Sequence, residues 1–337
     1  MKLWVTGGAG FIGSNFVRYV LGRHADVHVT TFDCLTYAGN LANLESLRDD
    51  PRHRFVRGDV ADPEAVADAL DEGVDAIVHF AAESHVDRSI RDAAPFLRTN
   101  VAGTAVLLEA ARRLGGRRFL HVSTDEVYGS LGPEERASED APLRPTSPYA
   151  ASKAAADLLA LSYARTYGLD VVVTRCSNNF GPFQFPEKMI PLFITNAMAE
   201  QALPLYGDGG NVRDWIYVED HCAALDRVLA RGRGGEIYNI GAGNEWTNRA
   251  LTFEIVRRLG KSRDLVRPVE DRPAHDRRYA LDSTKLRRET GWEPEHGFSA
   301  ALDLTIDWYR QNEHWWKAVK SGEYQRFYEL WYGERLK

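Results

Sequence analysis

Apolar runs typical of β-strands alternate with helical patterns along the first half of the chain. We expect strands at residues 2–6, 27–32, 54–58, 76–80, 118–123 and 171–175, which are rich in Val, Ile and Phe like parallel strands buried on both faces. Helices are expected between them at residues 11–22, 63–70, 95–114 and 148–167. This alternation predicts an α/β fold with a Rossmann-type doubly wound parallel sheet.

The pattern loosens after Pro182, where glycine-rich turns such as 207–210 and 231–235 separate shorter elements. We therefore expect an NAD-binding domain of residues 1–182 that carries the catalytic residues. A smaller C-terminal substrate-binding lobe of residues 183–337 should follow, part of which returns to the sheet. The tail is rich in Trp and Tyr, which we interpret as packing against the body or a partner subunit.

Composition narrows the classes of protein that remain. The 337 residues are 44% hydrophobic, enough for two lobes, and no apolar run is long enough to span a bilayer. The first residues lack a signal-peptide pattern, so we expect a cytoplasmic protein without a membrane partner. Three scattered cysteines argue against a disulfide framework and against a metal site. A net charge of −6 offers no polybasic surface for nucleic acid.

A glycine motif follows the first expected strand and opens the first expected helix. Gly7, Gly10 and Gly13, with Phe11 and Ile12 between them, provide a tight turn and a close approach of the backbone to a pyrophosphate. The amino end of the helix adds free N–H groups and a positive dipole end. The spacing predicts a dinucleotide site, because a strand precedes the motif and a helix follows it.

Two carboxylates extend this predicted site. Asp33 ends the second expected strand, 20 residues after Gly13, where a carboxylate accepts hydrogen bonds from both ribose hydroxyls. It would repel a 2′-phosphate, so NAD is favoured over NADP. Asp59 follows the third strand and could accept from the adenine amino group, although an ordinary loop carboxylate is the alternative.

Tyr149 and Lys153 lie four residues apart on an expected helix and therefore share a face. An unperturbed tyrosine has a pKa of about 10. We expect the lysine ammonium and a nicotinamide cation to lower that pKa. Tyr149 could then accept a proton from a sugar hydroxyl while hydride leaves the same carbon.

The fifth expected strand leads into Thr124, Asp125 and Glu126, at the strand end where ligands bind in such sheets. Neighbouring side chains on a regular strand face opposite ways, so both carboxyls reach one cleft only if the chain is already leaving the strand. Thr124 can hydrogen-bond the reacting oxygen. An acid beside a base suits an elimination, in which one protonates a leaving hydroxyl and the other removes an adjacent C–H proton.

Seven segments give the chain its resemblance to a known family. It resembles the extended short-chain dehydrogenases/reductases, and among them the dTDP-glucose 4,6-dehydratase family. The matching segments span nearly the whole chain in order, at residues 6–14, 35–40, 80–89, 123–129, 147–153, 177–182 and 272–279. The Thr-Asp-Glu triplet is the most specific, because related epimerases and decarboxylases lack the aspartate.

The resemblance implies a reaction on dTDP-glucose with NAD retained throughout. Tyr149 would take the proton of the C4 hydroxyl as hydride passes from C4 to NAD. Glu126 would then remove the C5 proton, acidified by the 4-keto group, while Asp125 protonates the leaving C6 hydroxyl. Hydride then returns to C6 and C5 is reprotonated, so that the products are dTDP-4-dehydro-6-deoxy-glucose and water. Lys153 would also bind the nicotinamide ribose.

The resemblance also assigns the remaining site residues. The catalytic set is Thr124, Asp125, Glu126, Tyr149 and Lys153. The cofactor set includes the glycine motif, Asp33, Asp59, Tyr149 and Lys153. Its other members are Leu35, Thr36, Val60, Phe80, Ala81, Ala82, Ser84, Thr99 and Asn179. The nucleotide-sugar set is Ser84, Thr124, Asn178, Glu187, Lys188, Pro204, Tyr206, Arg213, Asn248, Asp271, Arg272 and His275. A homodimer through helices 95–114 and 148–167 is a further family expectation.

Two departures from the family pattern and two alternative functions stand beside this interpretation. Ala274 replaces a usual glycine, and Phe180 stands where tyrosine is common.

A UDP-sugar 4-epimerase or another nucleotide-sugar 4,6-dehydratase of the same fold is the first alternative, and Asp125 argues against the epimerase. A non-enzymatic NAD-binding regulator is the second. The choice of thymine over uracil depends on one methyl, worth about 1–3 kcal/mol, so the family supplies it rather than the residues.

Overall fold

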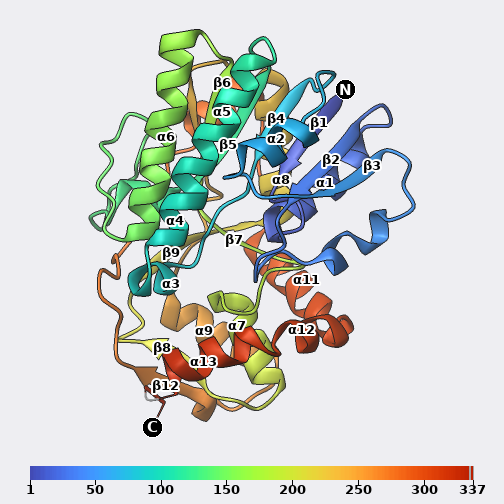
Figure 1. The fold of residues 1–337 in the computed structure, drawn as a ribbon. Helices are drawn as coiled ribbons and strands as arrows, with labels where there is room; N and C mark the ends of the chain where they lie inside the picture. The colour runs from blue at the N-terminus through green and yellow to red at the C-terminus, as the bar shows by residue number, and fades with distance from the viewer. Residues whose placement is uncertain (334, 337) are drawn as a thin grey trace.

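A parallel sheet of seven strands forms the centre of the protein, which the computed structural model describes at residues 1–333, 335 and 336 (Figure 1). The strands lie in the order β10-β6-β5-β4-β1-β2-β3. Their bounds are β1 Lys2–Thr6, β2 His28–Asp33, β3 His53–Arg57, β4 Ala76–His79, β5 Arg118–Thr124, β6 Val171–Cys176 and β10 Ile237–Ile240. The order reverses between β1 and β4, which is the switch point where doubly wound sheets bind dinucleotides. The expected fold class is confirmed.

Helices cover both faces of this sheet. One apolar cluster joins β-strand residues to α1 (Phe11–Arg23), α8 (Val218–Arg231) and α10 (Thr284–Thr290). A second cluster on the opposite face joins them to α2 (Pro63–Ala69), α5 (Thr104–Arg113) and α6 (Pro148–Tyr167). Because both faces of the sheet are buried, each strand is a nearly continuous run of apolar residues in the sequence.

One expected helix is interrupted in the structure. The stretch expected at residues 95–114 consists of α4 (Ala94–Phe96), a π-helical segment η2 (Leu97–Gly103) and α5. The side chain of Asn100 in η2 contacts the backbone of Glu83 at 2.9 and 3.0 Å and the hydroxyl of Ser152 at 2.8 Å. These buried polar contacts connect the helix to the loop after β4, a tertiary effect that helical periodicity does not reveal.

A second group of elements packs below the carboxyl ends of the strands (Figure 1). A separate apolar cluster with many aromatic side chains holds it together. Its helices are α7 Met189–Met198, α9 Asn248–Arg258, α11 Phe298–Gln311, α12 Glu313–Val319 and α13 Glu323–Tyr332. Its strands form two small sheets, β11 (Glu245–Thr247)-β9 (Val212–Tyr217)-β7 (Asn178–Phe180) and β12 (Val266–Val269)-β8 (Leu203–Tyr206).

The chain passes between the two groups several times. After β7, α7, β8 and β9 it returns through α8 to β10, which pairs in parallel with β6. It then leaves for α9 and comes back once more for α10. Short helices complete the connections at α3 Val86–Arg91, η1 Leu41–Leu47, η3 Asp125–Tyr128 and η4 Arg263–Leu265. No helix in the described residues is long and apolar enough to cross a membrane.

Candidate active site

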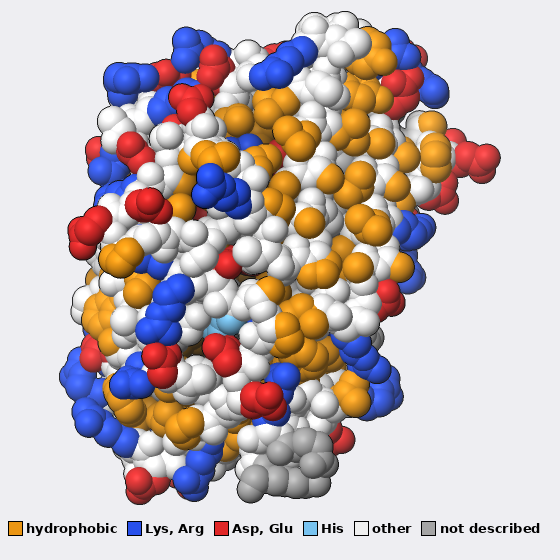
Figure 2. Space-filling model, turned by 90° about the vertical axis from the view of Figure 1, so that its left-hand side faces the viewer, with side chains coloured by type: hydrophobic (Ala, Val, Ile, Leu, Met, Phe, Trp, Pro, Cys, Tyr) orange, Lys and Arg blue, Asp and Glu red, His pale blue; other side chains and the backbone are white. Residues whose placement is uncertain are grey.

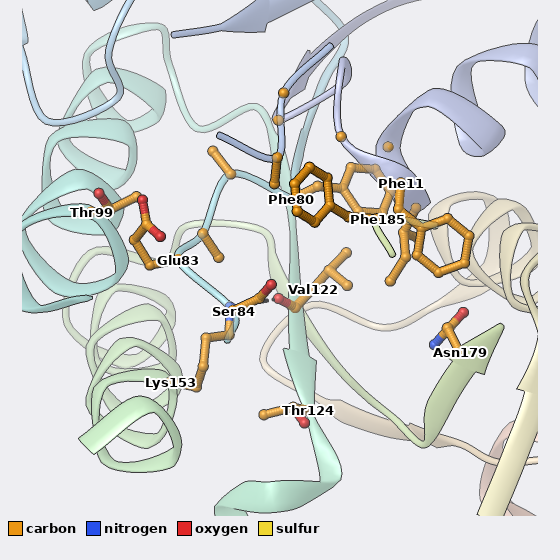
Figure 3. Close-up of a pocket in the computed structure, with 18 of the residues that line it drawn as sticks. Phe11, Phe80, Glu83, Ser84, Thr99, Val122, Thr124, Lys153, Asn179 and Phe185 are labelled. Carbon is orange, nitrogen blue, oxygen red and sulfur yellow. Dashed lines mark hydrogen bonds between the residues drawn. The ribbon is translucent and has the colours of Figure 1, made fainter. Parts of the chain in front are cut away.

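A long pocket lies along the carboxyl ends of β1, β2, β4 and β5 (Figure 3). All but two of the residues predicted for the cofactor line it. They are Gly7, Gly10, Phe11, Ile12, Gly13, Asp33, Thr36, Val60, Phe80, Ala81, Ala82, Ser84, Thr99, Tyr149, Lys153 and Asn179. Figure 3 shows Phe11, Phe80 and Phe185 grouped at one side of this space, while Lys153 and Thr124 extend into it from α6 and β5.

The glycine turn leaves no room for side chains. Gly7 has φ of +68°, and a Cβ added to it would lie 2.5 Å from the backbone nitrogen of Ala81. A Cβ on Gly13 would lie 2.3 Å from the carbonyl oxygen of Gly7. Gly10 is the N-cap of α1 and has no side chain that could occupy the first N–H groups of the helix. This bare helix end fits a pyrophosphate, as the sequence predicts.

Asp33 lines the pocket at the end of β2 and is held by two backbone donors. Ala9 N–H donates to one carboxyl oxygen at 3.0 Å, and Leu35 N–H donates to the other at 2.8 Å. Leu35 itself has φ of 58° and lies outside the pocket lining, so it contacts the site through the Asp33 carboxyl. Burial raises the pKa of Asp33, and the two N–H donors oppose that shift.

Asp59 is the other predicted cofactor residue that does not line the pocket. Its carboxyl is bound by other groups of the protein. Its two oxygens accept from Arg98 Nη1 at 2.6 Å and from the backbone N–H of Ala61 at 2.9 Å. Arg98 lies on the π-helical segment η2, which the sequence did not predict. The structure therefore places Asp59 at the edge of the cofactor pocket, with its oxygens engaged by the protein.

The Thr-Asp-Glu triplet stands where β5 stops. Thr124 is the last residue of β5, and Asp125 begins the 3-10 helix η3, with Thr124 as its N-cap. The backbone N–H of Glu126 donates to the Thr124 hydroxyl at 3.3 Å. The strand thus ends just before the two carboxyls, and both line the same pocket, as the elimination hypothesis requires.

The two carboxyls have different electrostatic environments. Burial, followed by the charge of Glu126, raises the pKa of Asp125 well above its usual value. Burial also raises the pKa of Glu126, and Arg272, Lys188 and Arg213 oppose the rise. Burial thus raises the pKa of both carboxyls, and three cations limit the rise at Glu126, whereas Asp125 has Arg213 alone. One Asp125 oxygen, Oδ2, is buried without a hydrogen-bond partner among the described residues, so it can donate to a ligand once protonated.

Tyr149 and Lys153 both line the pocket from α6. Lys153 Nζ donates to the carbonyl of Val122 at 2.8 Å, and burial lowers its pKa to about 8. Burial, then Glu126, raises the pKa of Tyr149 well above its usual value. The expected lowering depends on a nicotinamide cation as well as Lys153, whereas in the protein alone burial of the phenolate dominates.

A second pocket adjoins the first and contains most of the residues predicted for the nucleotide sugar. The two pockets share Glu126, Asn178, Glu187 and Lys188. The second is also lined by Pro204, Tyr206, Arg213, Asn248, Arg272 and His275. Ser84 and Thr124 line the first pocket instead. Glu126 therefore lies where the first pocket, predicted for the cofactor, meets the second, predicted for the nucleotide.

Asp87, on α3, is a site residue that sequence reasoning missed. It lines the second pocket, is buried, and accepts from Arg272 Nη1 at 2.7 Å. Its position inside the matching segment 80–89 was the available signal, but a helix just after β4 was not expected. Arg213 is anchored differently, because its Nη2 donates to the backbone carbonyl of Asp276 at 2.9 Å and its guanidinium lies 4.2 Å from the ring centre of Tyr279.

The two departures from the family pattern have distinct consequences. Phe180 is fully buried among Trp215, Tyr217 and Phe298 and does not line the cofactor pocket, so a hydroxyl there would enter an aromatic core. Ala274 has φ of 52°, the left-handed region that favours glycine. It lies in the loop where Asp271, which lines neither pocket, accepts from His275 Nδ1 at 2.6 Å.

Replacing Ala274 by Gly should stabilise the protein. Removing Cβ at φ of 52° relieves local strain, and the net gain after the added freedom of the unfolded chain is about 1 kcal/mol. Thermal unfolding should show a higher Tm. Ala300→Gly, at an exposed position inside α11, is the matched control and should lower Tm, because glycine is unfavourable in a helix. A lower Tm for Ala274→Gly would show that the backbone at Ala274 is not strained.

Comparison with known proteins agrees with this geometry. A family model described as GDP-mannose 4,6 dehydratase matches residues 4–305. A dTDP-glucose 4,6-dehydratase of Streptomyces niveus is 55% identical, over 95% of this chain and 96% of its own. The crystal structure of DesIV, a dTDP-glucose 4,6-dehydratase from Streptomyces venezuelae with NAD bound, is 56% identical with a TM-score of 0.93, over 95% of this chain and 100% of its own. The UDP-glucose 4-epimerase of Thermus thermophilus with NAD is 35% identical with a TM-score of 0.86, over 93% and 100%.

The doubly wound sheet, the bare glycine turn and the Tyr149–Lys153 pair on α6 define an extended short-chain dehydrogenase/reductase. The Thr-Asp-Glu triplet narrows this class further. The chain belongs to the dTDP-glucose 4,6-dehydratase family, within the larger group that the GDP-mannose 4,6 dehydratase model describes.

Proposed function

We propose that this protein is an NAD-dependent hydro-lyase that converts dTDP-glucose to dTDP-4-dehydro-6-deoxy-glucose and water. The observation that carries the proposal is the adjacent pair Asp125–Glu126, which lines the first pocket together with Tyr149 and of which Glu126 also lines the second pocket. An epimerase needs an acid–base group at C4 alone, whereas this site has two further carboxyls, and burial raises the pKa of each.

The chain's own residues divide the proton transfers between them. Bound NAD would supply the hydride acceptor at C4, the hydride donor at C6 and a positive charge beside Tyr149. Tyr149 takes the proton of the C4 hydroxyl, which Thr124 hydrogen-bonds. Glu126, where three cationic neighbours oppose the rise in pKa that burial causes, takes the C5 proton, and C5 is reprotonated once hydride has returned to C6. Asp125, whose pKa burial raises well above its usual value, gives its proton to the departing C6 oxygen, so that water leaves.

The nucleotide half of the substrate has a basic pocket available. Arg213, Arg272 and Lys188 line the second pocket, and guanidinium groups offer paired donors to phosphate oxygens. We propose that these cations hold the diphosphate and that the apolar side chains nearby hold the nucleoside. We also propose that residues 1–182 supply the cofactor and catalytic groups, and that residues 183–337 supply most of the nucleotide contacts.

Product identification from dTDP-, UDP- and GDP-glucose tests the function. We expect a 4-keto-6-deoxy product, detected by its absorbance in alkali, with dTDP-glucose the preferred substrate. Conversion to dTDP-galactose with no keto sugar would favour the epimerase. NAD binding without turnover on any of the three sugars would favour a regulator.

We further propose a homodimer through the helices at residues 94–113 and α6. Leu97, Leu158 and Tyr167 on these helices are 56%, 59% and 56% exposed, which is unusual for large apolar side chains in one region. Figure 2 shows this side of the molecule, with an extended group of hydrophobic side chains on it. A partner copy would bury them.

Replacing Leu158 by Glu should therefore produce monomers, because a charge cannot enter a buried apolar interface without a partner. Sedimentation velocity of the purified protein measures this. Leu304→Glu, on the exposed face of α11 and 49% exposed in the wild type, is the control and should stay dimeric. Monomeric wild-type protein, or an unchanged Leu158→Glu dimer, would contradict the proposed interface.

We propose a cytoplasmic location as well. Cys34, Cys176 and Cys222 are all free thiols, which suits a reducing compartment. Fractionation of the source cells would test it, and recovery of the protein outside the cytoplasmic fraction would contradict it.

A further inference from the structure

The aromatic C-terminal tail reaches the nucleotide pocket. Tyr332, the last residue of α13, is 7% exposed and lines that pocket together with Asp87, Tyr206 and Arg272. These residues come from α13, from α3, from the end of β8 and from the loop after β12. In Figure 1, α13 lies in red across the lower lobe, beside α9 and β8. None of the reaction steps derived above uses it.

A chain of hydrogen bonds links Tyr332 to Arg272. The Tyr206 hydroxyl lies 3.2 Å from that of Tyr332 and 2.9 Å from Asp87 Oδ2. The other oxygen of Asp87, Oδ1, accepts from Arg272 Nη1 at 2.7 Å. A phenol has one proton, and an ionised carboxylate only accepts, so Tyr206 donates to Asp87 and Tyr332 donates to Tyr206. Trp331 Nε1 also donates to the Tyr206 oxygen.

Because the hydrogen bonds run in this direction, Tyr332 influences the position of Arg272 through Tyr206 and Asp87. Tyr206 has its proton committed to Asp87, and its oxygen is held by two donors from α13. Asp87 has one oxygen on Tyr206 and one on Arg272, so it fixes the guanidinium in place. The ring of Tyr332 also lies 6.0 Å from that of Tyr206 and closes one side of the pocket.

We propose that α13 is part of the nucleotide-binding site and that Tyr332 is a positioning residue for substrate. It acts through Tyr206 and Asp87 to hold Arg272 against the diphosphate of a nucleoside diphosphate sugar. This inference rests on the proposed function, because it assigns the diphosphate to Arg272. Arg272 acts on Glu126 only through its charge, which a Tyr332 variant leaves in place, so Tyr332 affects nucleotide binding more than chemistry.

Steady-state kinetics on the full-length enzyme tests the proposal. Tyr332→Phe keeps the ring and removes the donated proton, so KM for dTDP-glucose should rise about fivefold while kcat falls by less than about twofold. Tyr332→Ala removes the wall as well, and its KM should rise more than about tenfold. Calorimetric titration with dTDP itself should show the same losses of affinity.

Tyr328→Phe is the matched control. Tyr328 lies one turn earlier on α13, and its hydroxyl accepts from Asn196 Nδ2 at 3.2 Å, outside the nucleotide pocket. Its KM should stay at the wild-type value. A double-mutant cycle of Tyr332→Phe with Asp87→Asn should show that the two effects are not additive, because they act on one chain of hydrogen bonds.

Each outcome decides the question. Equal KM values for Tyr332→Phe and Tyr328→Phe, or full additivity with Asp87→Asn, would overturn the inference. If Tyr332→Ala fails to fold, Tyr332→Phe alone decides. Wild-type enzyme that does not turn over dTDP-glucose would refute the proposed function instead, so the two failures are distinguishable.

Discussion

Replacing Tyr149 by Phe should lower kcat for dTDP-glucose by about three orders of magnitude, through loss of the first oxidation. Tyr149 is buried and lines the first pocket together with Thr124, Asp125 and Glu126. A phenylalanine fills the same space but cannot accept the proton of the C4 hydroxyl, so hydride transfer from C4 would leave a protonated and unstable oxygen. Stopped-flow absorbance of NADH in the presence of dTDP-glucose should show no transient.

Tyr163→Phe controls for the substitution itself. Tyr163 is on the same helix, packs its ring 5.0 Å from that of Tyr167, and lies outside both pockets. Its variant should turn over at the wild-type rate. The dTDP affinity of Tyr149→Phe should also be unchanged, because Tyr149 does not line the nucleotide pocket. A normal NADH transient in Tyr149→Phe would show that another group is the base.

Glu126→Gln should separate the oxidation from the elimination. The amide occupies the same volume but has no basic oxygen for the C5 proton. NADH should therefore accumulate on addition of dTDP-glucose, while release of the 4-keto-6-deoxy product falls by about two to four orders of magnitude. In D2O, the sugar should not exchange its C5 hydrogen. The readouts are NADH absorbance, product assay and mass spectrometry of the recovered sugar.

Asp125→Asn provides the comparison that assigns the two carboxyls. Burial raises the pKa of Asp125 well above its usual value, which favours the role of acid proposed for it. Its amide variant should still exchange C5 hydrogen, because Glu126 remains, yet lose water slowly. Glu134→Gln, at an exposed position, should behave as wild type. If Glu126→Gln eliminates water at the normal rate, the C5 base lies elsewhere.

The sequence predicted the Rossmann half well because buried parallel strands leave a strong local signal. Helix α6 has the bounds that were expected, since Pro148 begins it, Ser147 caps it and Gly168 ends it in a left-handed conformation. The strand bounds differ from the expected ones by about one residue, because the alternation of elements marks their centres better than their ends. The glycine turn was predictable because the tight backbone there leaves no room for side chains, and this requirement is visible in the sequence as the spacing of the glycines.

The remaining features depend on tertiary contacts that periodicity does not encode. Asn100 in the π-helical segment Leu97–Gly103 contacts distant backbone, and α3, which carries Asp87, is only 6 residues long, too short for a clear helical period. The raised pKa of Tyr149 could not be predicted from its spacing to Lys153, because the effect of burial on a phenolate depends on the packed structure. The position of Tyr332 in the second pocket could not be predicted, because it depends on how the C-terminal tail packs against the rest of the protein.

The repeated passage of the chain between the sheet and the lower lobe restricts how the enzyme can work. β10 is paired to β6 within the sheet, while β9 and α9, on either side of α8 and β10, belong to the lower lobe. Several covalent connections at different places resist a hinge between the two parts, unlike a single linker. We therefore expect the sugar to be bound in a cleft of nearly fixed width, where oxidation, loss of water and reduction proceed without a domain rotation between them. Small shifts of the hexose ring, rather than movements of the protein, would then bring C4, C5 and C6 in turn to their reaction partners.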